Sequence, residues 1–585
     1  MAGFGEERIK KKQSSQSKTK KQLRATGETL HRIAITHHAQ GDLINAEKNY
    51  REAIKTGYIN YNVFVNLGVI CKNSERSSEA LILYKKAIEV SPDQPDAYYN
   101  LGNLYQILGN FQDAVKFSAK SLELNPNNAE AHITLGWSQK ELGNLDQALA
   151  STLKSLELKS DNHTAHMNLG GIYKDLGNFD QAVSSMLKSL ELKSDNPTAH
   201  MNLGIIYKDL GNLDQALTST LKSLELNPNN PDALMNLGII YKDLGNLDQA
   251  LAYTLKSLEL KPDNTTAHMN LGGINQDLGK FDQAILHFKE ATKSSKTHEK
   301  ASTQLAKTYY FIDNFVDGIN AISGTHSEEA ENIRLSMHLC LNNKNEFNTC
   351  ANKLIKKGSL NQQGIAAIDH ANILFNQTLD NGLGGSTLDS IYTQTISENE
   401  LSDATVQQLL TKLTDESIQS RSQGLLVNGS QTSGNILDSP EKPFQELKAL
   451  LIQKISGYNK SCHINTDKNF DTNWEKNLYL LRGWAIIMDT GGNLMSHNHE
   501  DGWLTGTFYL QMPDEGFNAE EGAIEFSHQG PKYPAGNVEF EKRLMRPLAR
   551  DLNIFSSSLF HRTLPFQSTK QRICIAFDIS QRSKC

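Results

Sequence analysis

The stretch "TAHMNLGGIYKDLGNFDQAVSSMLKSLELKSDN", residues 164–196, decides the fold of the first half of this chain. Its apolar residues have helical spacing, a Leu-Gly-Asn break follows at residues 176–178, and a second helical stretch ends in a polar turn. The stretch therefore predicts a helical hairpin, in which two helices are joined by a tight loop.

This hairpin recurs along the chain at a period of 34 residues. The glycines that mark the period are Gly109, Gly143, Gly177, Gly211, Gly245 and Gly279, and the alanines are Ala46, Ala80, Ala114, Ala148, Ala182, Ala216, Ala250 and Ala284. One hairpin cannot bury its own apolar face, whereas eight stacked hairpins can cover one another. The sequence therefore predicts an all-α repeat array.

Within each hairpin, small residues such as Gly170 and Ala182 are expected where the two helices cross closely, with Leu169 and Tyr173 in the groove beside them. By this period and these residues, the chain from residue 28 to 295 closely resembles the tetratricopeptide repeat. Such repeats form superhelices that bind other proteins, and the resemblance implies the same for this chain.

The second helix departs from that pattern in the middle of the array. The large aromatic residue that is usual there is kept as Tyr50, Tyr84 and Phe288 but replaced by Thr152, Met186, Thr220 and Thr254. We therefore expect the middle repeats to pack differently. A ninth, degenerate unit is expected to cap the array, because Leu305 and Phe315 lie 34 residues after Leu271 and Phe281.

An asparagine recurs two residues before the small glycine of most units. These residues are Asn66, Asn100, Asn168, Asn202, Asn236 and Asn270. An amide can both donate and accept hydrogen bonds, so a row of asparagines can hold the backbone of an extended peptide. A similar ladder binds protein substrate in the O-linked N-acetylglucosamine transferases, which also carry tetratricopeptide repeats. Alternatively, near-identical repeats copy every residue, whether or not it binds anything.

Composition narrows the class of protein further. A net charge of −7 gives no basic excess for nucleic acid, and no apolar run approaches the ~20 residues of a membrane helix. Six widely spaced cysteines suit reduced thiols and a cytoplasmic location. We expect a disordered basic tail over residues 1–26, repeats over 27–325, a helical connector over 326–395 and a further domain over 396–585.

Short apolar runs with period-two alternation follow in this last domain, including "WAIIM", "LTGTFYLQM", "GAIEF", "LNIFSSSLF" and "RICIAFDI". Several short strands in ~110 residues favour a mainly β jelly roll, also called a double-stranded β-helix. The fold class is therefore multidomain, with an all-α superhelix followed by this β domain.

The segment "HNHED", residues 497–501, precedes one of these strands. His497, His499 and Asp501 are two residues apart and share one face of an extended chain, and His561 ends a distant strand. Two ligands from one segment and a third from elsewhere can occupy one face of an octahedral iron and leave positions open for substrate and oxygen.

Arg572 lies eleven residues after His561, where its guanidinium could hold a carboxylate bidentately. Together these elements resemble the 2-oxoglutarate and Fe(II)-dependent oxygenases, and more narrowly a bacterial group similar to prolyl hydroxylases. The resemblance implies Fe(II) and 2-oxoglutarate as cofactors, O2 as cosubstrate, and Arg572 as the anchor of the far 2-oxoglutarate carboxylate. Cys574 replaces the family's usual Ser or Thr, and Tyr509 could compensate for the lost hydrogen bond.

Two ligand registers remain open. The set of His499, Asp501 and His561 contains the carboxylate of the facial triad, and we favour it, with His497 then either supporting a ligand from outside or facing the substrate. His497 and His499 instead match the His-x-His of the narrower group. Two functions also remain open: a dioxygenase that hydroxylates a protein or peptide held by the repeats, proline being one candidate target, or a non-catalytic binding scaffold with a degenerate oxygenase fold.

Overall fold

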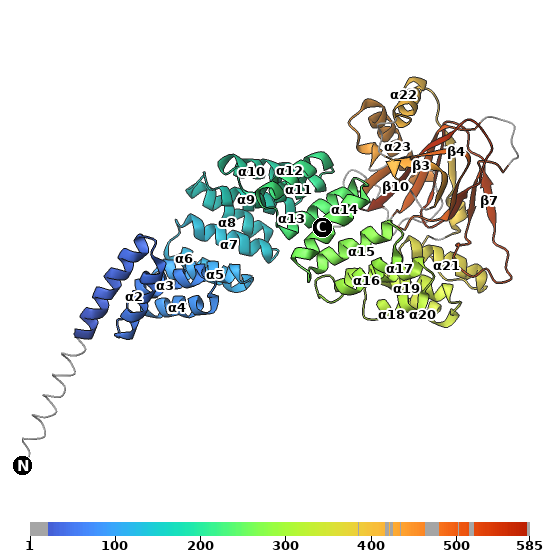
Figure 1. Ribbon diagram of the computed structural model, residues 1–585. Helices are drawn as coiled ribbons and strands as arrows, with labels where there is room; N and C mark the ends of the chain where they lie inside the picture. The colour runs from blue at the N-terminus through green and yellow to red at the C-terminus, as the bar shows by residue number, and fades with distance from the viewer. Residues whose placement is uncertain are drawn as a thin grey trace, which may run out of the picture. The chain divides into compact units, whose positions relative to one another are not determined.

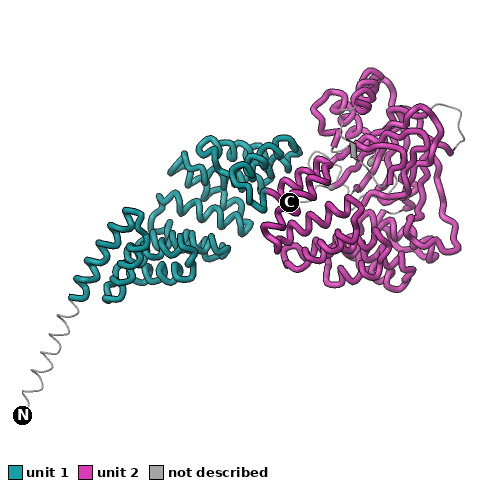
Figure 2. Tube along the Cα trace, viewed as in Figure 1, with its two compact units in different colours: residues 1–233 teal, residues 234–585 magenta. Residues whose placement is uncertain are grey.

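The computed structural model describes residues 22–383, 385–415, 420–421, 425–432, 435–461, 479–500, 502–513 and 520–581. The chain separates into two compact units, residues 1–233 and residues 234–585 (Figure 2). No helix of the described part is long and apolar enough to cross a membrane.

The first unit consists of helical hairpins (Figure 1). Its helices are residues 22–39, α2 (Leu43–Lys55), α3 (Tyr61–Asn73), α4 (Ser77–Val90), α5 (Pro95–Ile107), α6 (Phe111–Leu124), α7 (Ala129–Glu141), α8 (Leu145–Leu158), α9 (His163–Asp175), α10 (Phe179–Leu192), α11 (Pro197–Asp209) and α12 (Leu213–Leu226). An asparagine caps the N-terminus of many of these helices. The Asn162 side chain, for example, accepts hydrogen bonds from the backbone N–H groups of Thr164 and Ala165 at the start of α9.

The repeats form as the period predicts. All eight alanines that mark the 34-residue period are fully buried. The six glycines that mark the same period, Gly109 to Gly279, lie in the loops between helices and have positive φ. The unit without a glycine at this point places Glu75 there with φ of 60°, and Asp313 takes φ of 61° in the ninth unit. The left-handed loop is thus required by the hairpin geometry, and glycine is the residue that adopts it most easily.

The middle repeats keep the same helix contact with smaller residues. A Cβ added to Gly68 would lie 2.5 Å from the Tyr84 ring, and one added to Gly204 would lie 2.3 Å from Thr220 Oγ1. Threonine therefore occupies the position of the aromatic residue, against the same glycine. The middle repeats therefore differ in the size of this side chain, while the two helices still cross at the same glycine.

The second unit begins within α13 (Pro231–Asp243) and continues the hairpins. Its next helices are α14 (Leu247–Leu260), α15 (Thr265–Asp277), α16 (Phe281–Ala291), α17 (His298–Phe311), α18 (Phe315–Ala321), α19 (Glu328–Cys340), α20 (Lys344–Lys357) and α21 (Gln362–Leu374). The last three form the helical part of the connector, and they pack on the β domain through Tyr533 and Phe560.

The β domain is one antiparallel sheet that folds over on itself (Figure 1). Its strands are β1 (Tyr392–Thr395), β2 (Ser420–Arg421), β3 (Leu426–Thr432), β4 (Tyr479–His497), β5 (Leu504–Gln511), β6 (Ile524–Ser527), β7 (Lys542–Met545), β8 (Asp551–Ser556), β9 (Phe560–Thr563) and β10 (Arg572–Gln581). The order is β1-β8-β5-β10-β4-β9-β6-β7, with β3 on the other edge of β4 and β2 beyond β3.

Strand β4 makes the fold-over possible because its partner changes along its length. Residues 479–488 pair with β10, whereas Leu494 and His497 pair with β9. Gly491 lies between the two segments with φ of 75°. The helices α22 (Asp403–Leu413) and α23 (Lys442–Ser461) bury an apolar core against the outer face of the β4, β5, β8 and β10 layer.

Some boundaries differ from those expected. Strand β1 lies inside the stretch 326–395 and pairs with β8, so the sheet takes its first strand from the end of the connector. Residues 22–26 of the expected tail are helical, and residues 1–21 lie outside the described part. All five expected strands overlap strands of the sheet, namely β4, β5, β6, β8 and β10, but the run at residues 552–560 continues past β8 through a turn to the start of β9. The repeat array followed by an antiparallel β domain confirms the predicted fold class.

The helix crossing generates a first prediction. Gly204→Ala places a Cβ against Thr220 Oγ1 and 3.1 Å from Ala216 O, so overpacking of about 1–3 kcal/mol outweighs the ~1 kcal/mol gained from helix propensity. Gly171→Ala is the matched control, because its nearest neighbour is Lys140 Cε at 3.4 Å. Urea unfolding followed by helical circular dichroism should show a lower midpoint for Gly204→Ala alone. Equal midpoints for the two variants would refute the close contact of α11 and α12 at Gly204.

Candidate metal centre

Three histidines meet at the end of β4. His497 closes this strand and pairs with His561 of β9 across the ladder, and His499 follows two residues later. One nitrogen from each ring lies within 4.8 Å of the others, and within the described residues this is the only group of three or more His, Cys, Asp or Glu side chains so placed. The strand pairing thus brings together residues that are more than 60 positions apart in sequence.

Each of these rings has its Nδ1 atom engaged by an acceptor. His497 Nδ1 lies 2.8 Å from Met495 O, His561 Nδ1 lies 3.2 Å from Leu559 O, and His499 Nδ1 lies 2.8 Å from Asp578 Oδ2. These partners assign the proton to Nδ1 and leave the Nε2 lone pairs free. The Nε2 atoms of His497 and His499 lie 3.2 Å apart. Such outer hydrogen bonds are what orient metal-binding imidazoles in proteins.

The surroundings keep two of the rings neutral. Burial, together with neighbouring His499, lowers the pKa of His497 to about 4. Burial also holds the pKa of His561 well below its usual value. Neutral imidazole is the form that binds a metal ion, so His497 and His561 do not need to lose a proton at neutral pH.

Asp501, which the favoured register includes, lies outside the described residues. The structure therefore places His497, His499 and His561 together and leaves the position of Asp501 open. Both registers contain His499 and His561.

The histidines line a cavity of about 270 Å³, and Arg572 lies in the same cavity. The Arg572 side chain is 2 % exposed, and no carboxylate of the described residues forms an ion pair with it. Its guanidinium contacts Tyr509 OH at 3.4 Å and Met488 Sδ at 3.5 Å, and its Nε has no partner in the described part. A buried, unpaired cation costs several kcal/mol, so this arrangement calls for an anionic ligand.

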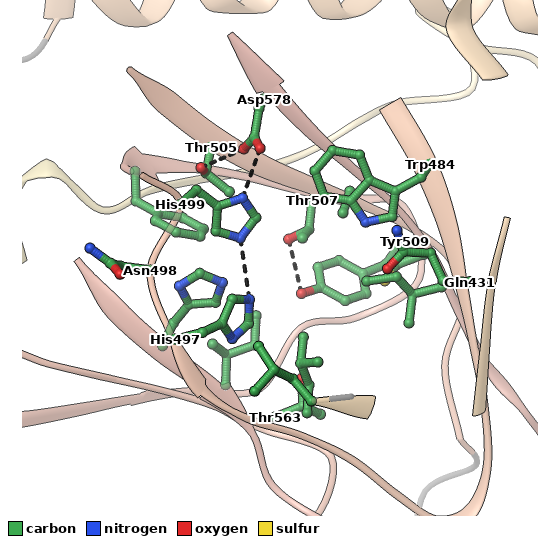
Figure 3. Close-up of a pocket in the computed structure, with 18 of the residues that line it drawn as sticks. Gln431, Trp484, His497, Asn498, His499, Thr505, Thr507, Tyr509, Thr563 and Asp578 are labelled. Atoms are coloured by element: carbon green, nitrogen blue, oxygen red, sulfur yellow. Dashed lines mark hydrogen bonds and ion pairs between the residues drawn. The ribbon is translucent and has the colours of Figure 1, made fainter. Parts of the chain in front are cut away.

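Tyr509 and Cys574 lie beside Arg572, as the sequence suggested. Burial raises the pKa of Tyr509 to about 12, and burial also raises the pKa of the Cys574 thiol. Both side chains are therefore neutral at physiological pH. Tyr509 OH also accepts a hydrogen bond from Thr507 Oγ1 at 3.0 Å (Figure 3). Tyr509 thus supplies a positioned hydroxyl next to a thiol, which is a weak hydrogen-bonding group.

Several residues of the cavity were not identified from the sequence, among them Trp484, Thr507 and Asp578 (Figure 3). Trp484 stacks on His499 with ring centroids 5.9 Å apart. Thr507 lies on the cavity face of β5 in period-two alternation with Tyr509, and Asp578 does so on β10 with Arg572. That alternation is the signal that could have placed these two residues; Trp484 of β4 has no such relation to a predicted site residue.

The six recurring asparagines lie on the first helix of their hairpins, four in the first unit and two in the second. Asn66 donates to Tyr50 OH at 3.1 Å. Asn168 is 2 % exposed, and its Oδ1 has no partner among the described residues. Asn270 is half-buried, and its Nδ2 likewise has no partner among them. Asn100, Asn202 and Asn236 are half-buried. The row thus includes amides with unused hydrogen-bonding capacity.

The residues of the cavity fit iron and a dicarboxylate. Three imidazoles whose Nδ1 atoms all have acceptors suit Fe(II), among other divalent transition metals. The buried guanidinium suits a carboxylate, which it can bind through two parallel hydrogen bonds. The two groups belong to one cavity, so a single small molecule could contact both.

Comparisons with known proteins agree with this site. A family described as "Putative 2OG-Fe(II) oxygenase" matches residues 482–578. Families of the tetratricopeptide repeat match between residues 74 and 298, including residues 170–211 and 231–264. No curated protein sequence matches the chain.

The similar solved structures are repeat proteins. The Cut9–Hcn1 hetero-tetramer of the APC/C is 19 % identical over 48 % of this chain, with a TM-score of 0.40, and the match spans 55 % of that chain. A tetratricopeptide repeat protein from Parabacteroides merdae is 21 % identical over 42 % of this chain and 98 % of its own, with a TM-score of 0.37. YrrB, described as having an unusual peptide-binding site, is 26 % identical over 32 % of this chain and 95 % of its own, with a TM-score of 0.26.

Residues 74–298 are therefore tetratricopeptide repeats, and residues 482–578 form a domain of the 2OG-Fe(II) oxygenase family.

Proposed function

We propose that this protein is a 2-oxoglutarate- and Fe(II)-dependent dioxygenase that hydroxylates a side chain of a protein or peptide held by its repeats. The observation that carries the proposal is the pairing, in one cavity, of three preoriented imidazoles with a buried guanidinium that has no carboxylate partner in the described chain. When bound, iron and 2-oxoglutarate supply the oxidising chemistry, in which O2 is consumed and 2-oxoglutarate becomes succinate and CO2.

For the metal, we propose His497, His499 and His561 as the ligands. Their Nδ1 atoms already have acceptors, so binding requires no change of tautomer. The alternative set replaces His497 by Asp501. For the cosubstrate, we propose that Arg572 binds the far carboxylate and that Tyr509 OH donates to it, with the Cys574 thiol beside them.

The capture of substrate rests on the second unit, where the repeats border the cavity. Lys242 of α13 pairs with Asp277 of α15 at 3.2 Å, and a Cβ on Gly273 of α15 would lie 3.0 Å from Lys242 Nζ. Lys307 of α17, one period after Gly273, lies 3.8 Å from Glu500, which lines the cavity. We infer that a segment bound along α13, α15 and α17 is directed towards the histidines.

The last repeat and the connector both contact the β domain through specific hydrogen bonds. Lys532 donates to Phe311 O at 3.0 Å, and Tyr533 OH donates to Ser336 Oγ at 3.2 Å. His370 of α21 bonds through Nε2 to Pro534 O at 3.0 Å. A bound segment would therefore meet the cavity in a fixed register, which favours one target residue over its neighbours.

We also retain the expected division into tail, repeats, connector and oxygenase domain, and a cytoplasmic location. The location is supported by the free thiols of Cys71, Cys340, Cys350 and Cys574, the cysteines that the structure describes.

Anaerobic titration of Fe(II) and 2-oxoglutarate tests the metal ligands. The chelate of the two gives a weak visible charge-transfer band, which the wild-type protein should show. His497→Ala should abolish it, because one of three imidazoles is lost, while Asp501→Ala should keep it. The reverse pattern would establish the His499, Asp501 and His561 set. No band with folded wild-type protein would favour the scaffold function.

A second prediction concerns the anchor. Arg572→Met removes the unpaired charge and keeps much of the volume, so the ligand-free protein should melt at the same or a higher temperature. In return, 2-oxoglutarate should no longer raise the melting temperature of the Mn(II)-loaded variant, although it does so in wild type. Continued stabilisation by 2-oxoglutarate would exclude Arg572 as the anchor.

The reaction itself is tested on captured proteins. Peptides from proteins retained by the full chain are incubated with it, Fe(II), 2-oxoglutarate and 18O2, and mass spectrometry reads the incorporated oxygen. We expect one modified residue at a constant distance from the retained segment. Retention of proteins without any incorporation, in a preparation that consumes no 2-oxoglutarate, would identify the chain as a scaffold.

A further inference from the structure

We infer that Asp578 is a positioning residue of the metal centre, which fixes the His499 ring and supplies the negative charge that a ligand set of three imidazoles lacks. This inference rests on the proposed metal site. It extends that site because Asp578 would act on a bound metal only through His499.

The Asp578 carboxylate is held at both oxygens. Oδ2 accepts a hydrogen bond from His499 Nδ1 at 2.8 Å, and Oδ1 accepts one from Thr505 Oγ1 at 2.7 Å (Figure 3). Thr505 Oγ1 lies 2.7 Å from Ser557 Oγ, so a third residue completes the chain. The side chain is 18 % exposed. Its orientation is therefore set by the protein rather than by water.

The strands place this chain of contacts. Asp578 of β10 pairs directly with Thr505 of β5, so the two side chains emerge side by side on the cavity face. His499 is held from two further directions, since its N–H donates to Ser557 O at 2.9 Å and its ring stacks on Trp484 with an interplanar angle of 17°. The ring has little freedom to turn away from its partner.

Among the three histidines, only His499 has a charged acceptor at Nδ1. His497 and His561 donate to backbone carbonyls, of Met495 and Leu559. A carboxylate on the far nitrogen makes an imidazole a stronger ligand. The usual facial triad has one carboxylate and two histidines, and it brings one negative charge to the iron. Asp578 restores this charge one hydrogen bond further out, while the carboxylate position of the triad is taken by a histidine.

Cobalt substitution tests this role without turnover. The full-length protein is titrated with Co(II) in air, and the affinity and the visible d–d spectrum are recorded for wild type, Asp578→Asn and Asp578→Ala. Loss of an outer partner typically weakens metal binding about 10–100-fold, so Asp578→Ala should fall in that range. Asp578→Asn keeps an acceptor oxygen but no charge, so it should retain part of the affinity and shift the d–d bands.

Asp551→Asn is the matched control. Asp551 is a buried aspartate of the same sheet, with Oδ1 accepting from Thr395 Oγ1 at 2.6 Å and Oδ2 from the Leu548 N–H at 2.8 Å, and it does not line the cavity. Its substitution should lower the melting temperature and leave both cobalt readouts unchanged. A role of Asp578 in folding alone predicts the same behaviour for Asp578→Asn.

The possible outcomes distinguish the metal site itself from the role of Asp578. Wild-type protein that binds no Co(II) would refute the metal site itself. Wild-type binding with an unchanged affinity and spectrum in Asp578→Asn would overturn the role of Asp578 and leave the metal site standing. Should Asp578→Ala fail to fold, the isosteric Asp578→Asn decides by the same two readouts.

Discussion

The pairing of β10 with β4 and β5 is the constraint on which the candidate site depends. In this register, Ile573, Ile575 and Phe577 face the helices α22 and α23, while Arg572 and Asp578 face the cavity. A slip of one residue would exchange the two faces, burying a guanidinium against leucines and opening the apolar core. Packing of the apolar face of β10 against the helices thus also fixes where its polar residues lie in the cavity. The register of β10 therefore determines both the core packing and the geometry of the site.

The same strand separates two charges of opposite sign. Arg572 begins β10 and Asp578 lies six residues further on, beside His499. A dicarboxylate bound at Arg572 and a metal cation bound at the histidines would each meet the charge of opposite sign. Preoriented charges of this kind act strongly in a buried cavity, because little water screens them.

Much of the fold could be predicted from the sequence. The repeats were recognisable because the same residue pattern recurs in each copy. Glycines such as Gly177 also mark a loop that needs positive φ. Strands β5 and β10 were visible because they alternate strictly. Strand β1 was missed because it is four residues long and polar, and its place in the sheet comes from its pairing with β8.

The site was partly visible for the same reason. His499, His561 and Arg572 stand out as residue types in order along the chain, and the structure brings them into one cavity. The choice between His497 and Asp501 depends on how the chain leaves β4, which spacing alone does not determine. Alternation with Arg572 could have placed Asp578 on the cavity face of its strand, but not its contact with His499, which is 79 positions away.

Release of labelled CO2 from carboxyl-labelled 2-oxoglutarate tests the central claim most directly. The purified full chain is supplied with Fe(II), ascorbate and air, and a sample treated with an iron chelator serves as the blank. The account predicts iron-dependent release of CO2 with an equal amount of succinate. A folded protein that binds iron and 2-oxoglutarate but releases no CO2 above the blank would contradict it.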